Sequence, residues 1–325
     1  MSGADAGYAL GAVNALSAVS ASGTVDASGA VNALLIQVVA GLAAGGIIGF
    51  GALRAGWLAD RAAAFAAALV GGLIFGFAAW TGALLLLAFF VSSSLLSRLP
   101  TAGGEWRARR GRPSARGAAM VGQQGGRESY SADAHGRVAQ RRDAQGRTAR
   151  QVLANGAVAA ACAMAVGLLD VTWAKMALAG ALAAATADTW ATEVGTWWGG
   201  EARSAVTGHI VSPGESGGMT PAGTLAAMVG AAGIGFLAWL SWPDIGVQEA
   251  FMIEAAGFIG MWVDSALGAT VQYKAQCPTC GCIIEEPRHV HAVTGRRGLR
   301  FLDNHAVNLA ATLTGALAAL YLATT

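Results

Sequence analysis

Repeated apolar runs of about 20 residues constrain the fold of this chain more than any other feature. An α-helix rises about 1.5 Å per residue, so a run of this length crosses the roughly 30 Å hydrocarbon core of a bilayer. The 325-residue chain is 54% hydrophobic and 12% charged, whereas soluble globular domains carry about 25% charged residues. We therefore expect an all-α fold: a polytopic bundle of membrane helices forming a single integral membrane domain over 1–325.

The positions of the apolar runs predict about eight to nine transmembrane helices. They are expected at 31–53, 60–79, 84–99, 151–169, 173–197, 221–242, 249–273 and 303–323, and 8–22 is a shorter further candidate. The N-terminus lacks a basic segment followed by a short apolar core, so we expect no cleavable signal peptide.

The distribution of Lys and Arg predicts the orientation of these spans. When the spans are threaded in order, every one of the 21 basic residues except Lys175 falls in loops on one side. The positive-inside rule makes that side cytoplasmic, and we expect an integral protein of a bacterial inner membrane. The 99–150 segment is rich in Arg, Gly, Gln and Ser and predicts a flexible basic cytoplasmic loop. No aromatic residues alternate with its arginines, which favours contact with membrane lipids over binding to nucleic acid.

Three acidic residues inside expected spans need a partner. Asp188 and Glu193 lie in 173–197, and Asp264 lies in 249–273. A charged side chain at mid-bilayer costs roughly 2.5–3.5 kcal/mol on insertion scales, and the spans contain no Lys or Arg at this level. Asp188 and Asp264 each lie about 13 Å from the cytoplasmic end of their helix. We expect the three carboxylates to form a catalytic centre and to bind Mg²⁺, which oxygen ligands select over zinc.

Further polar residues lie at this level or nearer the cytoplasm. They are Asn155, Gln272, Asp303, Asn304 and Asn308, and each type is also common in helix caps or in hydrogen bonds between helices. The segment Ser212-Pro-Gly-Glu-Ser-Gly-Gly218 offers convergent backbone N–H groups and hydroxyls for a phosphate, with Ser212, Gly214, Ser216, Gly217 and Gly218 as the candidate ligands. It lacks the ending of a Walker loop, and a plain turn before the next span is the alternative.

A cluster of Cys and His residues marks the cytoplasmic loop 274–300. Its members are Cys277, Cys280, Cys282, His289 and His291, and their spacing is typical of a small structural Zn²⁺ site. The alternative is a reduced loop without metal. Cys162 stands alone in an apolar run, where we expect it to pack against other helices.

Several motifs occur together and in order. They are Gln151-Val-Leu-Ala-Asn-Gly156, Ala187-Asp-Thr-x-x-Thr-Glu-x-Gly195, Ser212-Pro-Gly-x-Ser-Gly-Gly218, Asp264-Ser-x-x-Gly-Ala-x-x-Gln272 and Leu302-Asp-Asn-His-x-Val-Asn308. This set resembles a transmembrane family that includes plant and cyanobacterial phytyl-phosphate kinases and an animal transmembrane protein. The chain departs from many members at His305, where they carry Asp, and in a longer 101–149 loop.

The resemblance implies a kinase that converts an isoprenoid monophosphate, phytyl-like or another prenyl, to the diphosphate. A nucleoside triphosphate, CTP or ATP, would be the donor, and Mg²⁺ would bind at Asp188, Glu193 and Asp264. The prenyl phosphate lipid and membrane lipids are the expected partners. Two alternatives stay open: a cation-coupled membrane transporter, which needs a site reachable from both faces, and a cytidylyltransferase-like lipid enzyme, which would release pyrophosphate.

Overall fold

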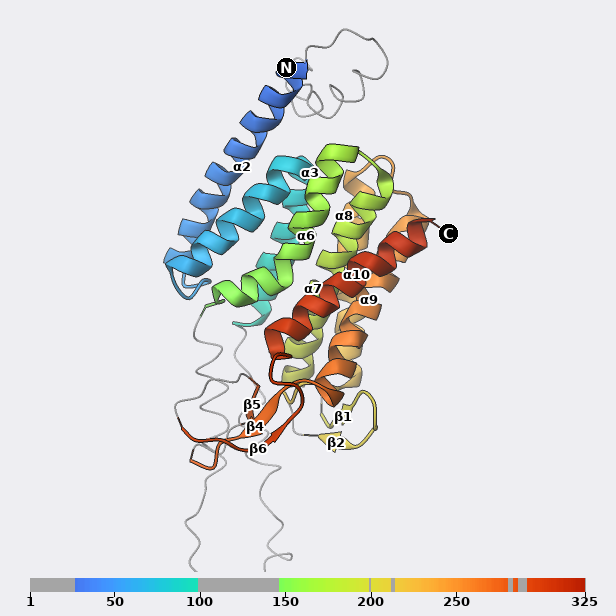
Figure 1. Cartoon of the computed structure of the whole chain (residues 1–325). Coiled ribbons are helices and arrows are strands. Elements are labelled where there is room, and N and C mark those ends of the chain that lie inside the picture. The colour runs from blue at the N-terminus through green and yellow to red at the C-terminus, as the bar shows by residue number, and fades with distance from the viewer. Residues whose placement is uncertain are drawn as a thin grey trace, which may run out of the picture.

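A computed structural model describes residues 27–98, 146–198, 200–211, 214–279, 283–285 and 291–324 (Figure 1). The helices of this part of the chain are α2 (Ala27–Arg54), α3 (Arg61–Leu96), α6 (Ala149–Leu169), α7 (Thr172–Trp198), α8 (Pro221–Ser241), α9 (Val247–Thr270) and α10 (Asn304–Thr324). The candidate span 8–22 and the expected basic loop, from 99 to 145, lie outside the described residues.

Six of the described helices are long and apolar enough to cross a membrane: α2 from Leu34 onward, α3, α6, α8, α9 and α10. The expected number of eight to nine is therefore not confirmed. Two features of the helices lower the count. Helix α3 joins two expected spans, and the polar residues of α7 keep that helix outside the six although it is 27 residues long.

Helix α3 folds back on itself at Ala79, whose backbone has φ 51° and ψ −149°. A Cβ atom on Gly71 would lie 3.7 Å from Leu86 Cδ2, and one on Gly82 would lie 3.0 Å from Ile74 Cγ2. In a straight helix, residues 71 and 86 would be about 22 Å apart. The helix is thus a pair of antiparallel arms (Figure 1), with its turn at the boundary between the expected spans 60–79 and 84–99.

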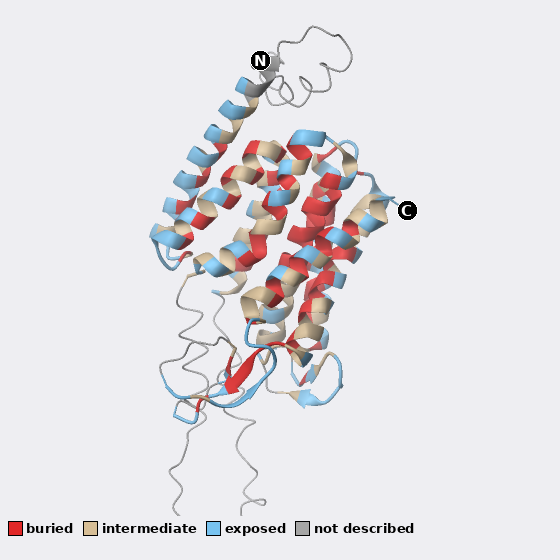
Figure 2. Cartoon of the chain, viewed as in Figure 1, coloured by how far each residue is buried: buried red, intermediate tan, exposed pale blue. Residues whose placement is uncertain are grey.

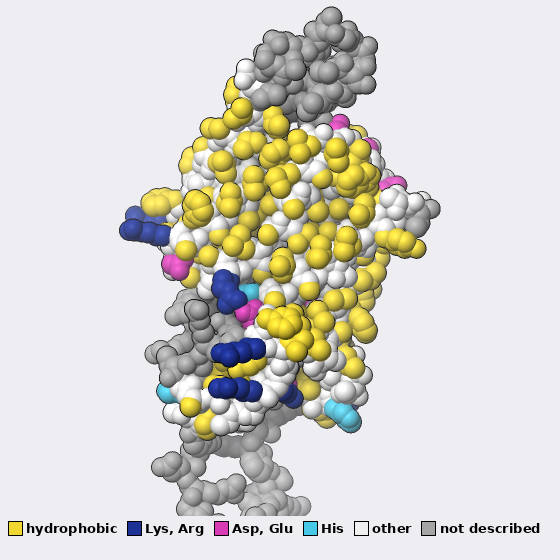
Figure 3. All heavy atoms as spheres, viewed as in Figure 1, with side chains coloured by type: hydrophobic (Ala, Val, Ile, Leu, Met, Phe, Trp, Pro, Cys, Tyr) yellow, Lys and Arg dark blue, Asp and Glu magenta, His cyan; other side chains and the backbone are white. Residues whose placement is uncertain are grey.

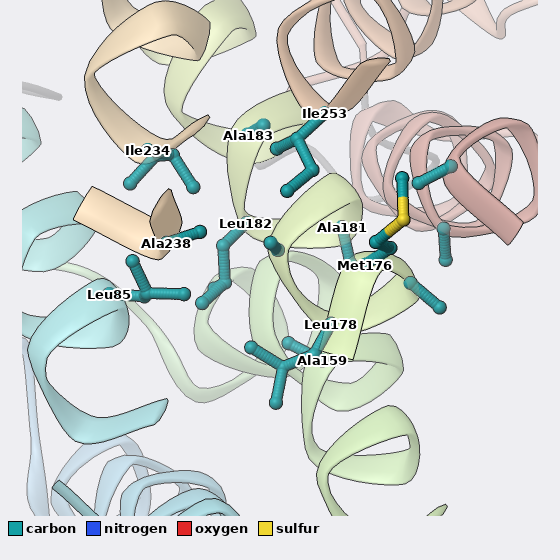
Figure 4. Close-up of a cluster of buried hydrophobic side chains, with 14 of the residues drawn as sticks. Leu85, Ala159, Met176, Leu178, Ala181, Leu182, Ala183, Ile234, Ala238 and Ile253 are labelled. Carbon is teal, nitrogen blue, oxygen red and sulfur yellow. The ribbon is translucent and has the colours of Figure 1, made fainter. Parts of the chain in front are cut away.

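Helix α7 lies at the centre of the bundle. Every residue from Met176 to Ala187 is buried. Figure 4 shows side chains of this helix between those of its neighbours, including Leu85 of α3, Ile234 of α8 and Ile253 of α9. Small residues permit this close packing, because a Cβ atom on Gly180 would lie only 2.5 Å from the carbonyl oxygen of Gly315 in α10.

Two small antiparallel sheets lie at one end of the bundle (Figure 1). The first has the order β2-β1-β3, from β1 (Ala202–Ser204), β2 (Ile210–Val211) and β3 (Gly218–Met219). The second has the order β5-β4-β6, from β4 (Lys274–Gln276), β5 (Ile283–Ile284) and β6 (Thr294–Arg297). The sequence did not predict these strands, because runs of two to four residues carry no clear alternation of polar and apolar side chains. The bundle itself is α-helical, as expected.

The same end of the bundle carries the described basic residues except Lys175, and we call it the basic end. They are Arg54, Arg61, Arg98, Arg147, Arg150, Arg203, Lys274, Arg296, Arg297 and Arg300. Figure 3 shows Lys and Arg side chains below a wide apolar surface that covers the helices. An apolar outer surface of this size suits contact with lipid tails. We call the other end, which carries Lys175, the opposite end.

Candidate functional site

The burial and the polarity of helix α7 change at Asp188. The helix is buried from Met176 to Ala187, and Figure 2 shows the buried residues gathered toward the middle of the bundle. Asp188, Thr189 and Trp190, in contrast, are only half-buried, and Thr192 is exposed. The polar stretch singled out in the sequence thus begins where the helix leaves the closed core. It faces a more open region toward the basic end.

Asp264 on α9 is buried and lies close enough to Asp188 on α7 for their charges to interact. With its amide nitrogen turned toward α9, the buried Asn308 of α10 donates to Asp264 Oδ2 at 3.2 Å and to the Asn304 carbonyl oxygen at 2.8 Å. In the other orientation of the amide, Asn308 donates to Asn155 Oδ1 of α6 at 3.3 Å. Four helices therefore bring these expected site residues together.

Glu193 has different partners. Ser97 donates from Oγ to Glu193 Oε1 at 2.5 Å, and the charge of Arg147 also acts on Glu193. The Arg147 guanidinium lies over the rings of Phe89 and Phe90, at 5.3 and 5.6 Å from their centroids. Burial lowers the pKa of Arg147 to about 10, and the nearby Glu193 opposes this shift. Arg147, which precedes α6 and lies outside the expected spans, therefore gives Glu193 a nearby cation that the sequence analysis did not assign to it.

The carboxylates fit a magnesium ion only in part. Within the described ranges, no three His, Cys, Asp or Glu side chains form a group that could hold a metal ion. The predicted centre of Asp188, Glu193 and Asp264 is thus not preformed. Mg²⁺ is commonly held by one or two carboxylates together with substrate phosphates and water. The interacting pair Asp188 and Asp264 fits that description.

The glycine-rich loop packs against the last turn of α9. Gly217 has φ +82°, and a Cβ atom there would overlap the backbone nitrogen of Ala269. A Cβ atom on Gly268 would in turn lie 2.8 Å from the Gly217 nitrogen. Glycine is required at 217 by both its backbone conformation and the close contact. The predicted ligands Gly214, Ser216 and Gly218 belong to the same loop, and Ser212 lies outside the described residues.

One N–H group of this loop already binds a carboxylate oxygen of the same chain. The backbone nitrogen of Ser216 donates to Glu285 Oε1 at 3.2 Å, so a carboxylate oxygen already sits on one loop N–H group. Gln272 Nε2 donates to Ser216 Oγ at 3.2 Å. The other amide atom, Gln272 Oε1, is buried and has no hydrogen-bond partner among the described residues. The charge of Glu285 also acts on Asp264, which links the loop to the buried carboxylates.

Two cations that the sequence analysis did not single out flank the glycine-rich loop. Lys274 is buried, and its Nζ donates to the Ser216 carbonyl oxygen at 2.6 Å and lies 3.3 Å from Glu215 Oε1. Arg297 pairs with the same Glu215 oxygen at 2.8 Å. The position of Lys274, two residues after Gln272, was the one signal in the sequence that could have placed it here.

Asp303 has a structural role. Its Oδ1 accepts from the backbone nitrogens of His305 and Ala306 at 3.1 and 3.0 Å, which caps α10, and its Oδ2 pairs with Arg150 at 2.5 Å. Burial would raise the pKa of Asp303, but the hydrogen bonds from Ala306 and Arg150 outweigh it and hold the pKa below its usual value. The cap and the ion pair account for this residue without a ligand.

The serines that end α3 were also missed as site residues. Ser92 accepts from Trp190 Nε1 at 3.1 Å, and Ser97 holds Glu193 as described above. The hydroxyls of Ser93 and Ser94 are buried without a hydrogen-bond partner among the described residues. A run of serines at the end of an apolar span was the available signal. Ser92 and Ser97 thus place two hydroxyls beside the stretch from Asp188 to Glu193.

The Cys/His cluster is described only in part. Cys277 Sγ lies 3.7 Å from His291 Nδ1, whereas Cys280, Cys282 and His289 lie outside the described residues. The predicted zinc group is therefore represented by two of its five members. Cys162 is half-buried and packs against the main core, as the sequence predicted.

Comparisons with known proteins give a family match and two partial relatives. A family described as "Integral membrane protein DUF92" matches residues 43–316. Protein PGR of Arabidopsis thaliana is 30% identical over 145 residues, which are 41% of this chain and 49% of that protein. An uncharacterised membrane protein of Methanocaldococcus jannaschii is 30% identical over 164 residues, which are 50% of this chain and 57% of that protein. The matches thus span about half the length of these curated relatives, and no solved structure matches the chain.

Proposed function

The chain belongs to the DUF92 family of integral membrane proteins, and from that premise we propose that it is a membrane kinase for an isoprenoid monophosphate. The product would be the diphosphate, and a nucleoside triphosphate would be the donor. One observation carries the proposal. The buried Asp264 interacts with both Asp188 and Glu285, and Glu285 itself occupies an N–H group of the glycine-rich loop. Metal-binding carboxylates beside an anion-binding loop suit phosphoryl transfer.

The chemistry needs positioning and charge neutralisation more than a strong base. An oxygen of the substrate monophosphate attacks the γ-phosphorus of the donor. The bond from that phosphorus to the bridging oxygen breaks, and the nucleoside diphosphate leaves. The attacking phosphate oxygen is already ionised near pH 7, because the second pKa of a phosphate monoester is about 6. Such a reaction depends on holding the two anions in line.

Each described element has a part in this proposal. Asp188 and Asp264 would hold Mg²⁺, and the ion would neutralise charge on the donor phosphates. The loop from Gly214 to Gly218 would bind phosphate oxygens through its N–H groups, with Lys274 and Arg297 beside it. The amides of Asn155, Gln272 and Asn308 would orient the two reactants. Glu193, which accepts from Ser97 and interacts with the charge of Arg147, would hold the surrounding helices rather than the metal.

The location of the site fits a lipid phosphate and a soluble nucleotide. Asp264 is buried in a helix that spans the bundle, whereas the glycine-rich loop lies at the basic end. The prenyl tail would lie between helices or in lipid, and its phosphate would reach the carboxylates near the end of the span. We propose that the basic end is cytoplasmic, in a bacterial inner membrane, where CTP or ATP is available.

A transporter has less support. The polar groups of the site gather at the basic end, whereas a carrier needs a binding site that opens to both faces. The described acids near Lys175 at the opposite end form ion pairs with it. Asp170 and Asp244 are therefore already balanced by Lys175.

The test is phosphate transfer by the purified full-length protein. The acceptors are phytyl, geranylgeranyl, farnesyl and undecaprenyl phosphates, and the donors are CTP and ATP labelled on either the α- or the γ-phosphate. A kinase transfers only the γ label, and only with Mg²⁺. Transfer of the α label from CTP would identify a cytidylyltransferase instead. No transfer to any of the acceptors would refute the proposal.

A further inference from the structure

Two tryptophans end helix α7 and lie stacked on one another. The ring centroids of Trp197 and Trp198 are 4.4 Å apart, and the angle between the ring planes is 11°. Trp197 is half-buried, whereas Trp198 is 70% exposed. Because Trp197 covers one face of the Trp198 ring, the exposed area lies on the other face and at the edges. The pair therefore presents a flat aromatic surface that is backed by a second ring.

The position of α7 argues against a membrane anchor. Tryptophans at helix ends commonly lie at the level of the lipid headgroups, on the lipid-facing side of a protein. Helix α7 instead packs against α3, α6, α8, α9 and α10. Its last turns contact α3 where Ser97 donates to Glu193. They contact the start of α8 where a Cβ atom on Gly195 would lie 3.5 Å from Gly223 Cα. The tryptophan pair thus ends the central helix, at the basic end.

The glycine-rich loop flanks the same turn of α7. A Cβ atom on Gly214 would lie 3.7 Å from Thr196 Cγ2. Beyond the other end of the loop, Thr220 Oγ1 lies 3.0 Å from the position of a Cβ atom on Gly195, and α8 then runs back along α7. Trp198 follows Gly195 by one turn on the same helix face. The end of the loop, just before Thr220, is therefore level with Trp198.

The spacing along the helices matches the parts of a nucleotide. Asp188 and Trp198 are ten residues apart, which is about 15 Å of helix. That length is comparable with an extended nucleoside triphosphate. The loop contacts α9 between Gly217 and Ala269, about 8 Å beyond Asp264 along that helix. From the core outward, the order is therefore the acidic pair of Asp188 and Asp264, the glycine-rich loop and the aromatic surface.

We propose that the base of the donor nucleotide stacks on Trp198, while the glycine-rich loop and the acidic pair hold its phosphates. This inference rests on the proposed function, because it names the residue that binds the donor of that reaction. Every base has a π-face, so stacking on tryptophan suits CTP and ATP alike. A prenyl phosphate has no aromatic ring. The surface therefore distinguishes the donor from the acceptor.

The experiment measures equilibrium binding to the purified full-length protein, with Mg²⁺ and without acceptor lipid. Trp198→Ala should weaken the binding of CTP and of ATP at least about fivefold, because base stacking contributes about that much. Inorganic triphosphate has phosphates but no base, so its affinity should stay within about twofold of wild type. Trp198→Phe keeps an aromatic ring and should restore most of the nucleotide affinity.

Trp80→Ala is the matched control. Trp80 is also 70% exposed and also contacts an aromatic ring, with its centroid 4.8 Å from that of Phe75. It lies, however, at the turn of α3, away from the glycine-rich loop. The Trp80 variant should therefore bind nucleotide and inorganic triphosphate as the wild type does.

The outcomes separate this proposal from the kinase function. Normal nucleotide binding by Trp198→Ala would overturn it, and so would an equal loss of nucleotide and inorganic triphosphate, which a displaced loop would cause. If wild type transferred phosphate but the Trp198 variant bound nucleotide normally, only the stacking would be refuted. If nucleotide binding depended on Trp198 but no phosphate were transferred, the stacking would stand and the kinase would be refuted. A wild-type protein that bound no nucleotide would refute both.

Discussion

Acidic residues have different partners at the two ends of helix α7. At the opposite end, Lys175 pairs with Asp170 at 3.1 Å and with Asp244 at 3.0 Å, and Thr172 donates to Asp244 at 2.8 Å. At the basic end, the charge of Asp188 meets two further carboxylates, Glu193 and Asp264. Acids that are paired with a cation serve the fold. Carboxylates that face one another stay charged together only if a positive partner balances them, and we propose that Mg²⁺ has this role for Asp188 and Asp264.

Packing along α7 follows the same division. From Met176 to Ala187 the helix consists of small and aliphatic residues apart from Thr186, and it is buried on all sides. From Asp188 to Trp198 most side chains are polar or aromatic, and none is buried. The buried part of the helix, up to Ala187, fixes the position of the part that follows. Packing of the buried part therefore holds Asp188 in place, and no ion pair between Asp188 and another described residue is needed for this.

The largest expected effect is on the carboxylates themselves. Asp264→Asn keeps the shape of the side chain and its contact with Asn308 but removes the charge that would hold Mg²⁺. We expect at least about a 100-fold loss of phosphate transfer, because a single preorganised electrostatic group supplies about that much. Asp188→Asn should behave in the same way. Transfer rates at saturating Mg²⁺ provide the measurement.

The matched control for these variants is at the other end of α7. Asp244→Asn removes a carboxylate that is paired with Lys175, and transfer should stay within about twofold of wild type, since surface ion pairs contribute little. If the Asp264 variant kept full activity, or if Asp244→Asn lost as much, the contrast between the two ends would be false.

The second effect concerns the glycine-rich loop. Gly217→Ala would place a Cβ atom on the Ala269 nitrogen at φ +82°. The left-handed conformation costs about 1–2 kcal/mol and overpacking about 1–3 kcal/mol. We therefore expect the free energy of unfolding, measured by thermal unfolding, to fall by about 2–5 kcal/mol, unless the loop moves away from α9 instead. In either case the affinity for the nucleotide should also fall.

Gly208 allows a fair comparison for that variant. It also has a positive φ, +68°, but nothing lies within 4 Å of the position of its Cβ atom. Gly208→Ala should therefore cost only the conformational part, about 1–2 kcal/mol, and leave nucleotide binding unchanged. Equal losses in the two variants would mean that the contact between Gly217 and α9 is unimportant.

Some of this site could be anticipated from the sequence and some could not. Equal depth on two parallel spans paired Asp188 with Asp264, because helical rise converts residue number into depth. Arg147 was assigned to a basic loop, since nothing in the sequence shows that its guanidinium turns back onto Phe89 and Phe90. Lys274 was hidden for the same reason. Its partner Glu215 is 59 residues away.

The fold shows the same limit. Apolar runs located the helices, and the turn in α3 lies at the boundary between two expected spans. Hydropathy alone, however, leaves out α7, the most buried helix, because Asp188, Glu193 and Lys175 lower its average. A buried polar side chain and an exposed one look alike in a sequence. Only their neighbours in space distinguish them.

A smaller effect is expected at Glu193. Glu193→Gln keeps a group that can accept from Ser97 but removes the charge opposite Arg147. Leaving a half-buried cation without its counter-charge should lower the free energy of unfolding by about 1–3 kcal/mol. The variant should retain Mg²⁺-dependent transfer within about tenfold, far more than Asp264→Asn retains. Glu201→Gln, at an exposed pair with Arg203, is the control and should change neither quantity. A loss of transfer as deep as that of Asp264→Asn would return Glu193 to the metal site.

The smallest expected effect concerns Asp244, which pairs with Lys175 at the opposite end. Burial would raise the pKa of Asp244, but hydrogen bonds from Thr172 and Lys175 outweigh it and hold the pKa below its usual value. A carboxyl whose pKa is lower in the folded state than its unfolded value of about 3.9 stabilises the fold above that pH. This contribution is lost as the pH falls through the folded pKa. Since Asp244 is more than a third exposed, we expect no more than about 1 kcal/mol. Thermal unfolding of Asp244→Asn and wild type should therefore differ at pH 7 and converge below about pH 4. A difference that persisted unchanged in acid would mean that the pair with Lys175 is not what distinguishes this end of α7.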